Sequence, residues 1–493
     1  MKMNELCISF AKCDRSEEVI DILKREGYWD DEQYWREFGD NENNYSTIGN
    51  QQSKPINALI EKLVNSGDSI LTSKVIEAGI DPKDKTRAPQ TMKDAMHKYL
   101  GVPNGDIYQL TPAKRTALGD ECGGVVVTGD NDNPTYAIFD FGEGQAPRDF
   151  PKTLCGLSQT NKQQIPFVQG KHCSGGTGAL SFVEDGIQLI ISRKSPKVNN
   201  RQYSDDIGFT VTRKFPAGQQ KSPTYKYFII NGEVPSFPAI PLSILPEIGN
   251  EQDAFCKDWE HGAFIKLFDY KIGAGLRTSS NIDLSNKLSV HLINPVFPIR
   301  FFERRSTSGK AHSSERTMSG LLTRLDTDRS QHIEQDTPYG FSFSVDQQDF
   351  IGEIYVLNSS TDRAIWNRFH GNDGVLYIVN GQANAFESNS IYRRKRIGLE
   401  YISNRIITII DCTKLDNDHH ADLFQNDRER LKDTPFTVDV KEAIESLLAS
   451  HQGLKDMSQK HREETVKDKL ANNKPLNKVM EKLIKLTIID FPF

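Results

Sequence analysis

The segment from residue 123 to residue 144 places the strongest constraint on the fold of this chain. It reads GGVVVTG, DNDNP and TYAIFDFGEG, so a cluster of turn-forming residues separates two apolar, β-prone runs. This pattern predicts two paired strands, the second of which ends in DFGEG. Further strand-like runs at 187–194, 208–215, 225–232 and 261–270 indicate a larger sheet.

A helix is expected to begin at Lys54-Pro55, since proline is tolerated in a first helical turn. Within it, the stretch LIEKLVNSGDSIL (59–71) carries a polar stripe. With Glu61 at zero, Asn65 falls at about 40° and Asp68 at about −20°, whereas the apolar residues fall between about 160° and 300°. Periodicity alone favours an ordinary surface helix whose solvent side carries charges.

Composition limits the class of protein. The chain has 493 residues, 37% hydrophobic and 26% charged, which is enough for sizeable cores in roughly two to four domains. The net charge of −6 argues against a protein coated in positive charge, although a local basic groove is compatible with it. No apolar run approaches the ~20 residues of a membrane span, and the N-terminus lacks the apolar region of a signal peptide.

The cysteines point to free thiols. They are odd in number, scattered and without a CxxC pair, so neither a disulfide framework nor a cysteine zinc site is indicated. We therefore expect a soluble cytoplasmic protein without membrane contact. The seven positions are Cys7, Cys13, Cys122, Cys155, Cys173, Cys256 and Cys412.

The second half of the chain is expected to form a separate domain, with a boundary near 275–290. A helix is predicted from residue 288 to Pro295, and polar loop or edge strand from 304 to 337. The runs 351–358, 374–386 and 405–415 predict strands, 390–402 predicts a charged helix, and 438–490 predicts a helical tail.

Three features in chain order suggest a nucleotide site. They are the stripe of Glu61, Asn65 and Asp68, the strand end with Asp140, and the glycine loop GKHCSGGTGALSF at 170–182. A carboxylate can orient a water for attack on phosphorus, and an amide oxygen suits Mg²⁺. An aspartate can accept a hydrogen bond from the amine of adenine, while a glycine loop can present N–H groups to phosphates.

These motifs resemble the GHKL superfamily, which includes gyrase B subunits, ninety-kilodalton heat-shock chaperones, histidine kinases and MutL. EKLVNSGDS resembles ExxxNxxD, DFGEG resembles DxGxG, GKHCSGGTGAL resembles the lid motif, and HGAFIKL (261–267) resembles the HGTxIxL strand. The resemblance covers about residues 45–275. It implies an α+β chain whose first domain is a Bergerat-fold α/β sandwich that binds ATP and Mg²⁺.

The resemblance also implies roles for individual residues. Glu61 is the expected general base, Asn65 the Mg²⁺ ligand and Asp140 the acceptor for the adenine amine. For Lys171 and His172, which lie inside the lid motif, solvent-facing loop positions are the favoured interpretation. The complete expected nucleotide-binding set is Asn65, Asp68, Asp140, Gly142, Gly144, Gly170, Lys171, Gly175, Gly176, Thr177 and Gly178.

One position departs from the family pattern. The family usually has threonine after HG, where its hydroxyl helps the aspartate to hold adenine, but this chain has Ala263. Either another hydroxyl takes over, with Thr210 and Thr212 as candidates, or adenine recognition is weaker. The long segment between the helix and DFGEG also indicates an insertion near 72–120.

The second half resembles a ribosomal-protein-S5-like transducer domain. LYIVNGQANAF, a helix and NRIITIIDCTKLD are similar to the corresponding strand, helix and strand of MutL. In the family this domain sends a cation to the γ-phosphate, and Lys414, Arg428 and Arg430 are candidates beside the alternative of ordinary surface cations. The basic cluster YRRKR (392–396) could face nucleic acid, although a solvated helix face also explains it.

The expected organisation has four parts: a helical N-terminal arm at 1–45, the ATP-binding domain at 46–280, the transducer at 288–437 and a helical tail at 438–493. The expected function is Mg²⁺-dependent ATP hydrolysis by a clamp that dimerises when ATP binds. Its partner is expected to be a protein that carries the effector activity, with DNA as a further candidate and phage defence as a candidate pathway. The alternatives are a non-hydrolysing ATP switch and a chaperone-like clamp, whereas a histidine kinase is disfavoured because no phosphoacceptor-histidine helix precedes the ATP domain.

Overall fold

The chain forms two compact units in the computed structural model. The first comprises Met1–Ser330 and Ile378–Asn384, and the second comprises Gln331–Tyr377 and Ala385–Phe493. The division after Ser330 lies later than the boundary that the sequence suggested. The structure describes residues 1–157, 164–170, 175–199, 204–217, 222–249, 253–307, 310–311, 314–359, 361–425 and 428–472.

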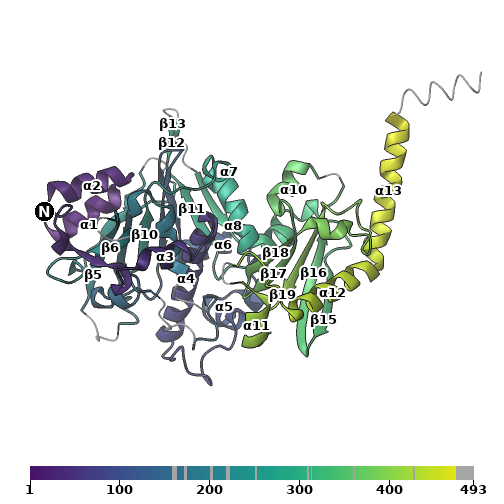
Figure 1. Ribbon diagram of the computed structural model, residues 1–493, viewed down its shortest axis with the longest axis horizontal. Coiled ribbons are helices and arrows are strands. Elements are labelled where there is room, and N and C mark those ends of the chain that lie inside the picture. Colours follow the sequence, from purple (N-terminus) through teal and green to yellow (C-terminus); the bar gives the residue numbers. More distant parts are fainter. Residues whose placement is uncertain are drawn as a thin grey trace, which may run out of the picture. The chain divides into compact units, whose positions relative to one another are not determined.

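A ten-stranded sheet organises the first unit (Figure 1). The predicted strand pair is confirmed, because β2 and β3 run antiparallel from Gly123 opposite Asp140 to Gly129 opposite Pro134. Along the sheet lie β1 (Trp35–Glu37), β6 (Thr224–Phe228), β5 (Asp206–Phe215), β4 (Gln188–Arg193), β10 (Gly262–Leu267), β3 (Pro134–Asp140), β2 (Gly123–Gly129), β11 (Ile299–Glu303) and β14 (Ser314–Met318), with β7 (Ser236–Pro238) paired to β5.

The pairing of β11 explains the later boundary. β11 runs parallel to β2, with Arg300 opposite Gly124, and β14 pairs with the other side of β11. The helix predicted from 288 ends at His291, before Pro295, and the chain then enters β11. Separate two-stranded ribbons are formed by β8 (Leu242–Leu245) with β9 (Lys257–Trp259) and by β12 (Ser306–Thr307) with β13 (Lys310–Ala311).

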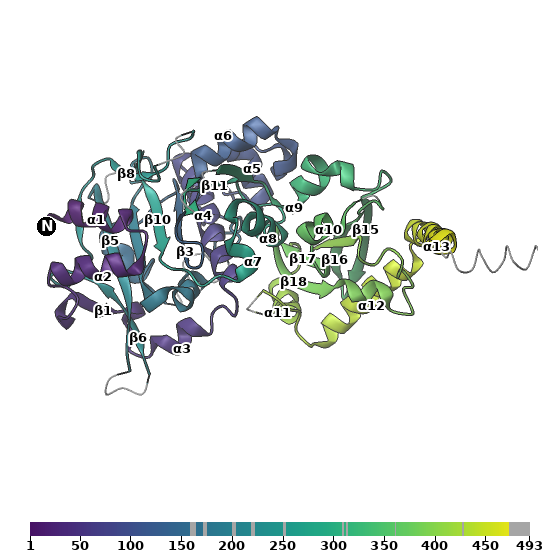
Figure 2. The same ribbon diagram turned by 90° about the horizontal axis from the view of Figure 1, so that it is seen from above.

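Helices cover both faces of this sheet, and Figure 2 shows the N-terminal pair and α4 on opposite sides of it. Successive residues of β2 enter different cores, Val125 and Val127 on one face and Val126 on the other. The helices of the unit are α1 (Met3–Lys12), α2 (Ser16–Arg25), α3 (Asn44–Gly49), α4 (Pro55–Glu77), α5 (Met92–Leu100), α6 (Pro112–Cys122), α7 (Ala274–Arg277), α8 (Ser285–His291) and α9 (Gly320–Thr323).

The N-terminal segment is part of this unit rather than a separate arm. Leu6 and Phe10 of α1 are fully buried, together with Val19 and Leu23 of α2, in the core on the face of the sheet opposite α4. The predicted helices within 1–45 are present, and they bury their apolar faces on the strands because they are amphipathic.

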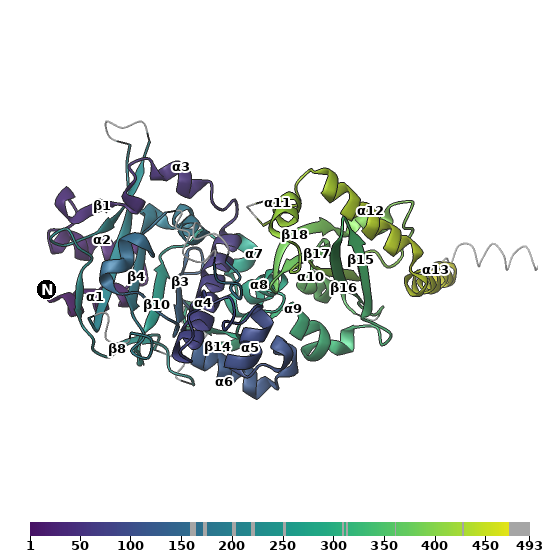
Figure 3. The ribbon, with the colours of Figure 1, turned by 90° about the horizontal axis from the view of Figure 1, so that it is seen from below.

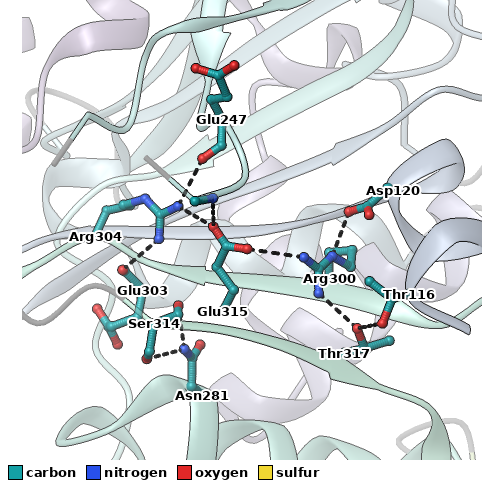
Figure 4. Close-up of polar contacts among 11 residues, drawn as sticks. Thr116, Asp120, Glu247, Asn281, Arg300, Glu303, Arg304, Ser314, Glu315 and Thr317 are labelled. Carbon is teal, nitrogen blue, oxygen red and sulfur yellow. Dashed lines mark hydrogen bonds and ion pairs between the residues drawn. The ribbon is translucent and has the colours of Figure 1, made fainter. Parts of the chain in front are cut away.

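An ion-pair network links β14, β11 and α6 at the end of the sheet (Figure 4). Glu315 on β14 accepts hydrogen bonds from Arg304 at 2.8 Å and from Arg300 at 3.3 Å. Arg300 also donates to Asp120 of α6 at 2.6 Å and to Thr317 at 2.8 Å. Since the Arg304 side chain is only 1% exposed, these contacts compensate a charge withdrawn from water.

The second unit contains a five-stranded sheet along which α12 lies (Figure 3). The strand order is β15 (Tyr339–Val345), β16 (Gln348–Val356), β19 (Ile406–Asp411), β17 (Asp373–Val379) and β18 (Gln382–Ser388). The helices are α10 (Arg363–Phe369), α11 (Asn417–Leu423), α12 (Pro435–Ser450) and α13 (Gln452–Asn472). Helices and sheets are thus mixed in both units, which confirms the α+β class.

The charged helix predicted at 390–402 does not form. A short 3-10 turn, η11 (Asn389–Arg393), ends where Arg394 adopts an extended conformation. The Tyr392 hydroxyl donates to the carbonyl oxygen of Gly374 at 2.7 Å and lies 2.8 Å from the Thr408 hydroxyl. This buried anchor and Gly398, at φ +71°, turn the backbone away from a helical path.

Within the described residues, none of the helices combines the length and the apolar character that a membrane span requires. None of the cysteines that the structure describes is in a disulfide, and Cys173 lies outside the described residues.

Candidate functional site

Helix α4 carries most of the residues of the candidate site, and its polar stripe is buried. The exposed fraction of Glu61 is 3% and that of Asp68 is 0%, whereas Asn65 is half-buried. The interpretation of α4 as an ordinary surface helix is therefore wrong. Buried carboxylates must gain partners inside the protein, because their transfer out of water is costly.

Asp68 gains its partners from the loop that begins the lid motif. Its Oδ1 accepts the backbone N–H of Gln169 at 2.7 Å, and its Oδ2 accepts that of Gly170 at 3.1 Å. Both carboxylate oxygens are thus occupied by the loop backbone. Asp68 anchors Gly170 to α4, which places the first lid glycine beside the stripe.

Asp140 lies buried at the end of β3. Its Oδ1 accepts the Gly142 N–H at 2.9 Å. Burial raises the pKa of Asp140 from 3.8 to about 6, and hydrogen bonds from Gly142, Ser66, Ala263 and Ser69 offset part of that rise. Its carboxylate is therefore held by backbone and hydroxyl donors from the DFGEG turn, β10 and α4.

The glycines after Asp140 let the turn press against α4. A Cβ atom on Gly142 would lie 2.3 Å from Ser69 Oγ, and one on Gly144, at φ +63°, would lie 1.9 Å from the Arg193 carbonyl oxygen. The Glu143 N–H donates to Ser69 Oγ at 3.0 Å. The DFGEG sequence is thus explained by close backbone approach, which brings Asp140 to the α4 surface.

The lid motif continues as a 3-10 helix, η6 (Gly175–Phe182), that packs on α3 and α4. Gly178 lies against Gln52, and the Thr177 hydroxyl donates to Gln51 Oε1. The two glutamines precede α4 and were not predicted as part of the site. Lys171 and His172 lie outside the described residues, whereas Gly175 and Gly176 begin η6.

A second tie holds the loop before the lid. The Gln169 side chain donates to the Asn380 carbonyl oxygen, and Asn380 Nδ2 donates to the Val168 carbonyl oxygen at 3.4 Å. Residues 378–384 belong to the first unit. The loop is therefore fixed by Asp68 through its backbone and by this short segment through the side chain of Gln169.

Ala263 has no replacement hydroxyl where the sequence suggested one. Ala263 lies opposite Asp140 in the β10–β3 pair. The Thr210 hydroxyl donates to the Phe228 carbonyl oxygen at 2.7 Å, and the Thr212 hydroxyl donates to that of Gly186 at 2.6 Å. The hydroxyl hydrogens of both threonines are thus donated to backbone carbonyls of β6 and of the turn before β4, and the hydroxyls that bond Asp140 come from Ser66 and Ser69 of α4.

A buried cation adjoins the stripe. Lys62 on α4 is buried, and desolvation lowers its pKa from 10.5 to about 8, an effect that the nearby Cys155 and Glu61 offset only in part. No sequence pattern indicated this burial, because a lysine on an amphipathic helix is normally solvated. Lys62 is thus a buried charge that follows Glu61 in α4 and interacts electrostatically with it.

The candidate sensor cations belong to the second unit. Lys414 is exposed after β19, Arg430 is exposed, and Arg428 has φ +55°. Their role at a phosphate stays a prediction. Within the same unit, Arg394 pairs with Glu445 and Arg396 donates to Ser446 at 2.9 Å, so α12 occupies part of the basic cluster.

No group of three histidine, cysteine, aspartate or glutamate side chains suited to a metal occurs in the described part of the chain. Mg²⁺ characteristically takes few protein ligands and completes its shell with waters and substrate phosphates, so the oxygen donors of Asn65 and Glu61 are of the type that this ion accepts. Comparison with models of known protein families and with curated protein sequences finds no match.

Proposed function

We propose that the first unit binds ATP with Mg²⁺ and hydrolyses it, as the resemblance to GHKL proteins implies. The observation that carries the proposal is the meeting of three distant motifs on α4. Asp68 bonds Gly170 of the lid motif, and Ser66 and Ser69 bond Asp140 of DFGEG. Carboxylates, an amide and a glycine loop along one helix face are the types of group that binding and hydrolysis of a nucleotide would use.

Each residue then has a defined task. Asp140 accepts a hydrogen bond from the base, and Asn65 supplies an oxygen to Mg²⁺, which neutralises phosphate charge when bound. Glu61, four residues before Asn65 on the same face, accepts the proton of the attacking water. Gly170 and the lid glycines through Gly178 close over the phosphates.

The wider role remains part of the proposal. ATP favours a closed state because it binds that state more tightly, and a homodimer held by two closed units is the expected product. The output is assigned to a protein partner, with DNA as a further partner and phage defence as the candidate pathway. The N-terminal helices are already packed on the sheet, so dimerisation need not wait for them to fold.

The test compares ATP hydrolysis by the wild type, Glu61→Ala and Glu77→Ala. Glu77 ends the same helix and pairs with Lys74 at 3.4 Å, so its removal controls for loss of a carboxylate from α4. We expect slow Mg²⁺-dependent turnover in the wild type and in Glu77→Ala, and a loss of about 10²–10⁴-fold in Glu61→Ala with ATP binding retained.

The same samples report the assembly state. Mass measured in solution with a non-hydrolysable ATP analogue is expected to double. Equal and measurable ATP turnover in the wild type and Glu61→Ala would show that Glu61 is not the base. ATP binding without turnover in any of the three proteins would indicate a non-hydrolysing switch. Absence of ATP binding in the wild type would refute the proposed function as a whole.

A further inference from the structure

The five-stranded sheet of the second unit ends in an edge strand, β15. Among the described strands, β15 pairs with β16 alone. The turn that joins them, Asp346-Gln347, has φ values of +48° and +62°, as a two-residue type I′ hairpin requires. Hydrogen-bonded and non-hydrogen-bonded pairs alternate along such a hairpin, so Gly340, Ser342 and Ser344 direct their backbone N–H and C=O groups away from β16.

These outward groups are available to another strand. Within the described part of the chain, no backbone hydrogen bond outside the β15–β16 pair involves Gly340, Ser342 or Ser344, and all three residues are exposed. Sheet edges are usually protected by a charged side chain, a proline or a bulge. The strand YGFSFSV contains no charge and no proline, and its seven residues pair with β16 in unbroken register.

An aromatic layer on one face of this sheet reaches the same edge. The fully buried ring of Phe350 lies 4.7 Å from that of Phe343 and 6.4 Å from that of Phe436 on α12, measured between ring centroids. Phe341 stacks beside Phe343 at 6.2 Å and packs over Gly352, where a Cβ atom would lie 2.4 Å from its ring. Phe341 and Phe343 are only half-buried, so the layer is left partly open to solvent at β15.

The sequence of β15 is complementary to itself. Around Ser342 it reads Gly-Phe-Ser-Phe-Ser, so a two-fold axis at Ser342 sets Phe341 opposite Phe343 of a second copy and Gly340 opposite Ser344 of that copy. The outward-facing positions are small and uncharged, which lets the two backbones approach without like-charge repulsion. The phenylalanines of both copies then share one face and continue the aromatic layer. About six backbone hydrogen bonds would join the two strands.

We propose that β15 pairs antiparallel with β15 of a second copy of this chain, centred on Ser342, so that the two five-stranded sheets become continuous. The contact lies in the second unit and requires no nucleotide. It is therefore distinct from the ATP-dependent dimer proposed above, and its test does not depend on that proposal. An interface of this size is small, so the dimer is weak and its population rises with protein concentration.

Sedimentation velocity of the nucleotide-free protein over roughly 1–200 µM measures this dimer. Ser342→Lys places two lysines directly opposite each other on the axis and should weaken the dimer by about tenfold or more. The matched control is Ile351→Lys, because Ile351 is 47% exposed and lies opposite Ser342 on β16. Its two added charges would be about 14 Å apart, three strand spacings, so the control should dimerise like the wild type.

A charge-reversed pair of variants completes the test. Ser342→Glu alone should also be a monomer, whereas an equal mixture of Ser342→Lys and Ser342→Glu should regain the dimer. Melting temperatures establish that each variant is folded. A wild type that stays monomeric at every concentration, an undiminished dimer in Ser342→Lys, or a mixture that remains monomeric would each overturn the proposal.

Discussion

The clearest quantitative consequence of the site concerns Asp140, whose charge is held in a buried position. Replacing Asp140 with asparagine keeps the size of the side chain and removes the charge. The amide oxygen can still accept the Gly142 N–H, and the amide nitrogen can donate to the Ser66 or Ser69 oxygen. We therefore expect Asp140→Asn to stabilise the nucleotide-free protein.

The magnitude follows from linkage. A folded-state pKa of about 6 against 3.8 corresponds to about 3 kcal/mol of destabilisation from the ionised group. Because the folded-state pKa is raised, this cost is absent below pH 3.8, grows as the pH rises to 6 and is complete above it. The gain from Asp140→Asn should thus be up to about 3 kcal/mol at pH 7.5 and about 1.5 kcal/mol at pH 5.

Urea unfolding of the wild type and Asp140→Asn at pH 7.5 and pH 5, followed by circular dichroism, measures both values. A variant that is neutral or destabilised at pH 7.5 would refute the reasoning, because it would show that the carboxylate is not under electrostatic strain. A gain that is the same at both pH values would show that its cause is not the ionisation of Asp140.

Three further predictions concern stability and are measured by the same urea titrations. Lys62→Met should raise the free energy of unfolding by up to about 3 kcal/mol at pH 7 and by less than about 1 kcal/mol at pH 10. The reason is that the cost of burying the lysine charge disappears as the pH rises from the folded-state pKa of about 8 to the ordinary value of 10.5. An equal gain at both pH values would contradict this prediction. Glu315→Ala should cost about 2–4 kcal/mol by leaving Arg304 buried without its carboxylate, and an unchanged midpoint would count against the network. Gly262→Ala should cost about 2 kcal/mol or more, since φ is +98° and a Cβ atom would lie 2.1 Å from a carbonyl oxygen of β3, whereas the control Gly275→Ala meets nothing and should be near neutral.

Local sequence chemistry predicted the elements whose causes are local. The turn residues between 129 and 135 set the β2–β3 pair, and Pro55 set the start of α4. The burial of the α4 stripe was not predictable from periodicity. A polar arc has the same spacing whether it faces water or a site, and only the contacts of Asp68 with Gln169 and Gly170 distinguish the two.

Features that depend on long-range pairing were missed. The parallel contact of β11 with β2 joins residues far apart in the chain, so the sequence placed the domain boundary too early. Ser66 was overlooked because a serine among apolar residues looks like a small helix-packing residue. The turn at Gly398 and the buried Tyr392 hydroxyl overrode the helical pattern at 390–402.

The central claim is that α4 and the DFGEG turn form a nucleotide site, and calorimetric titration of Mg²⁺-ATP into the wild type and Asp140→Asn tests it most directly. We predict that the wild type binds ATP and that Asp140→Asn binds at least tenfold more weakly although it unfolds at higher urea. This combination separates lost recognition from lost folding. Equal affinity in the two proteins, or no binding by the wild type, would contradict the account.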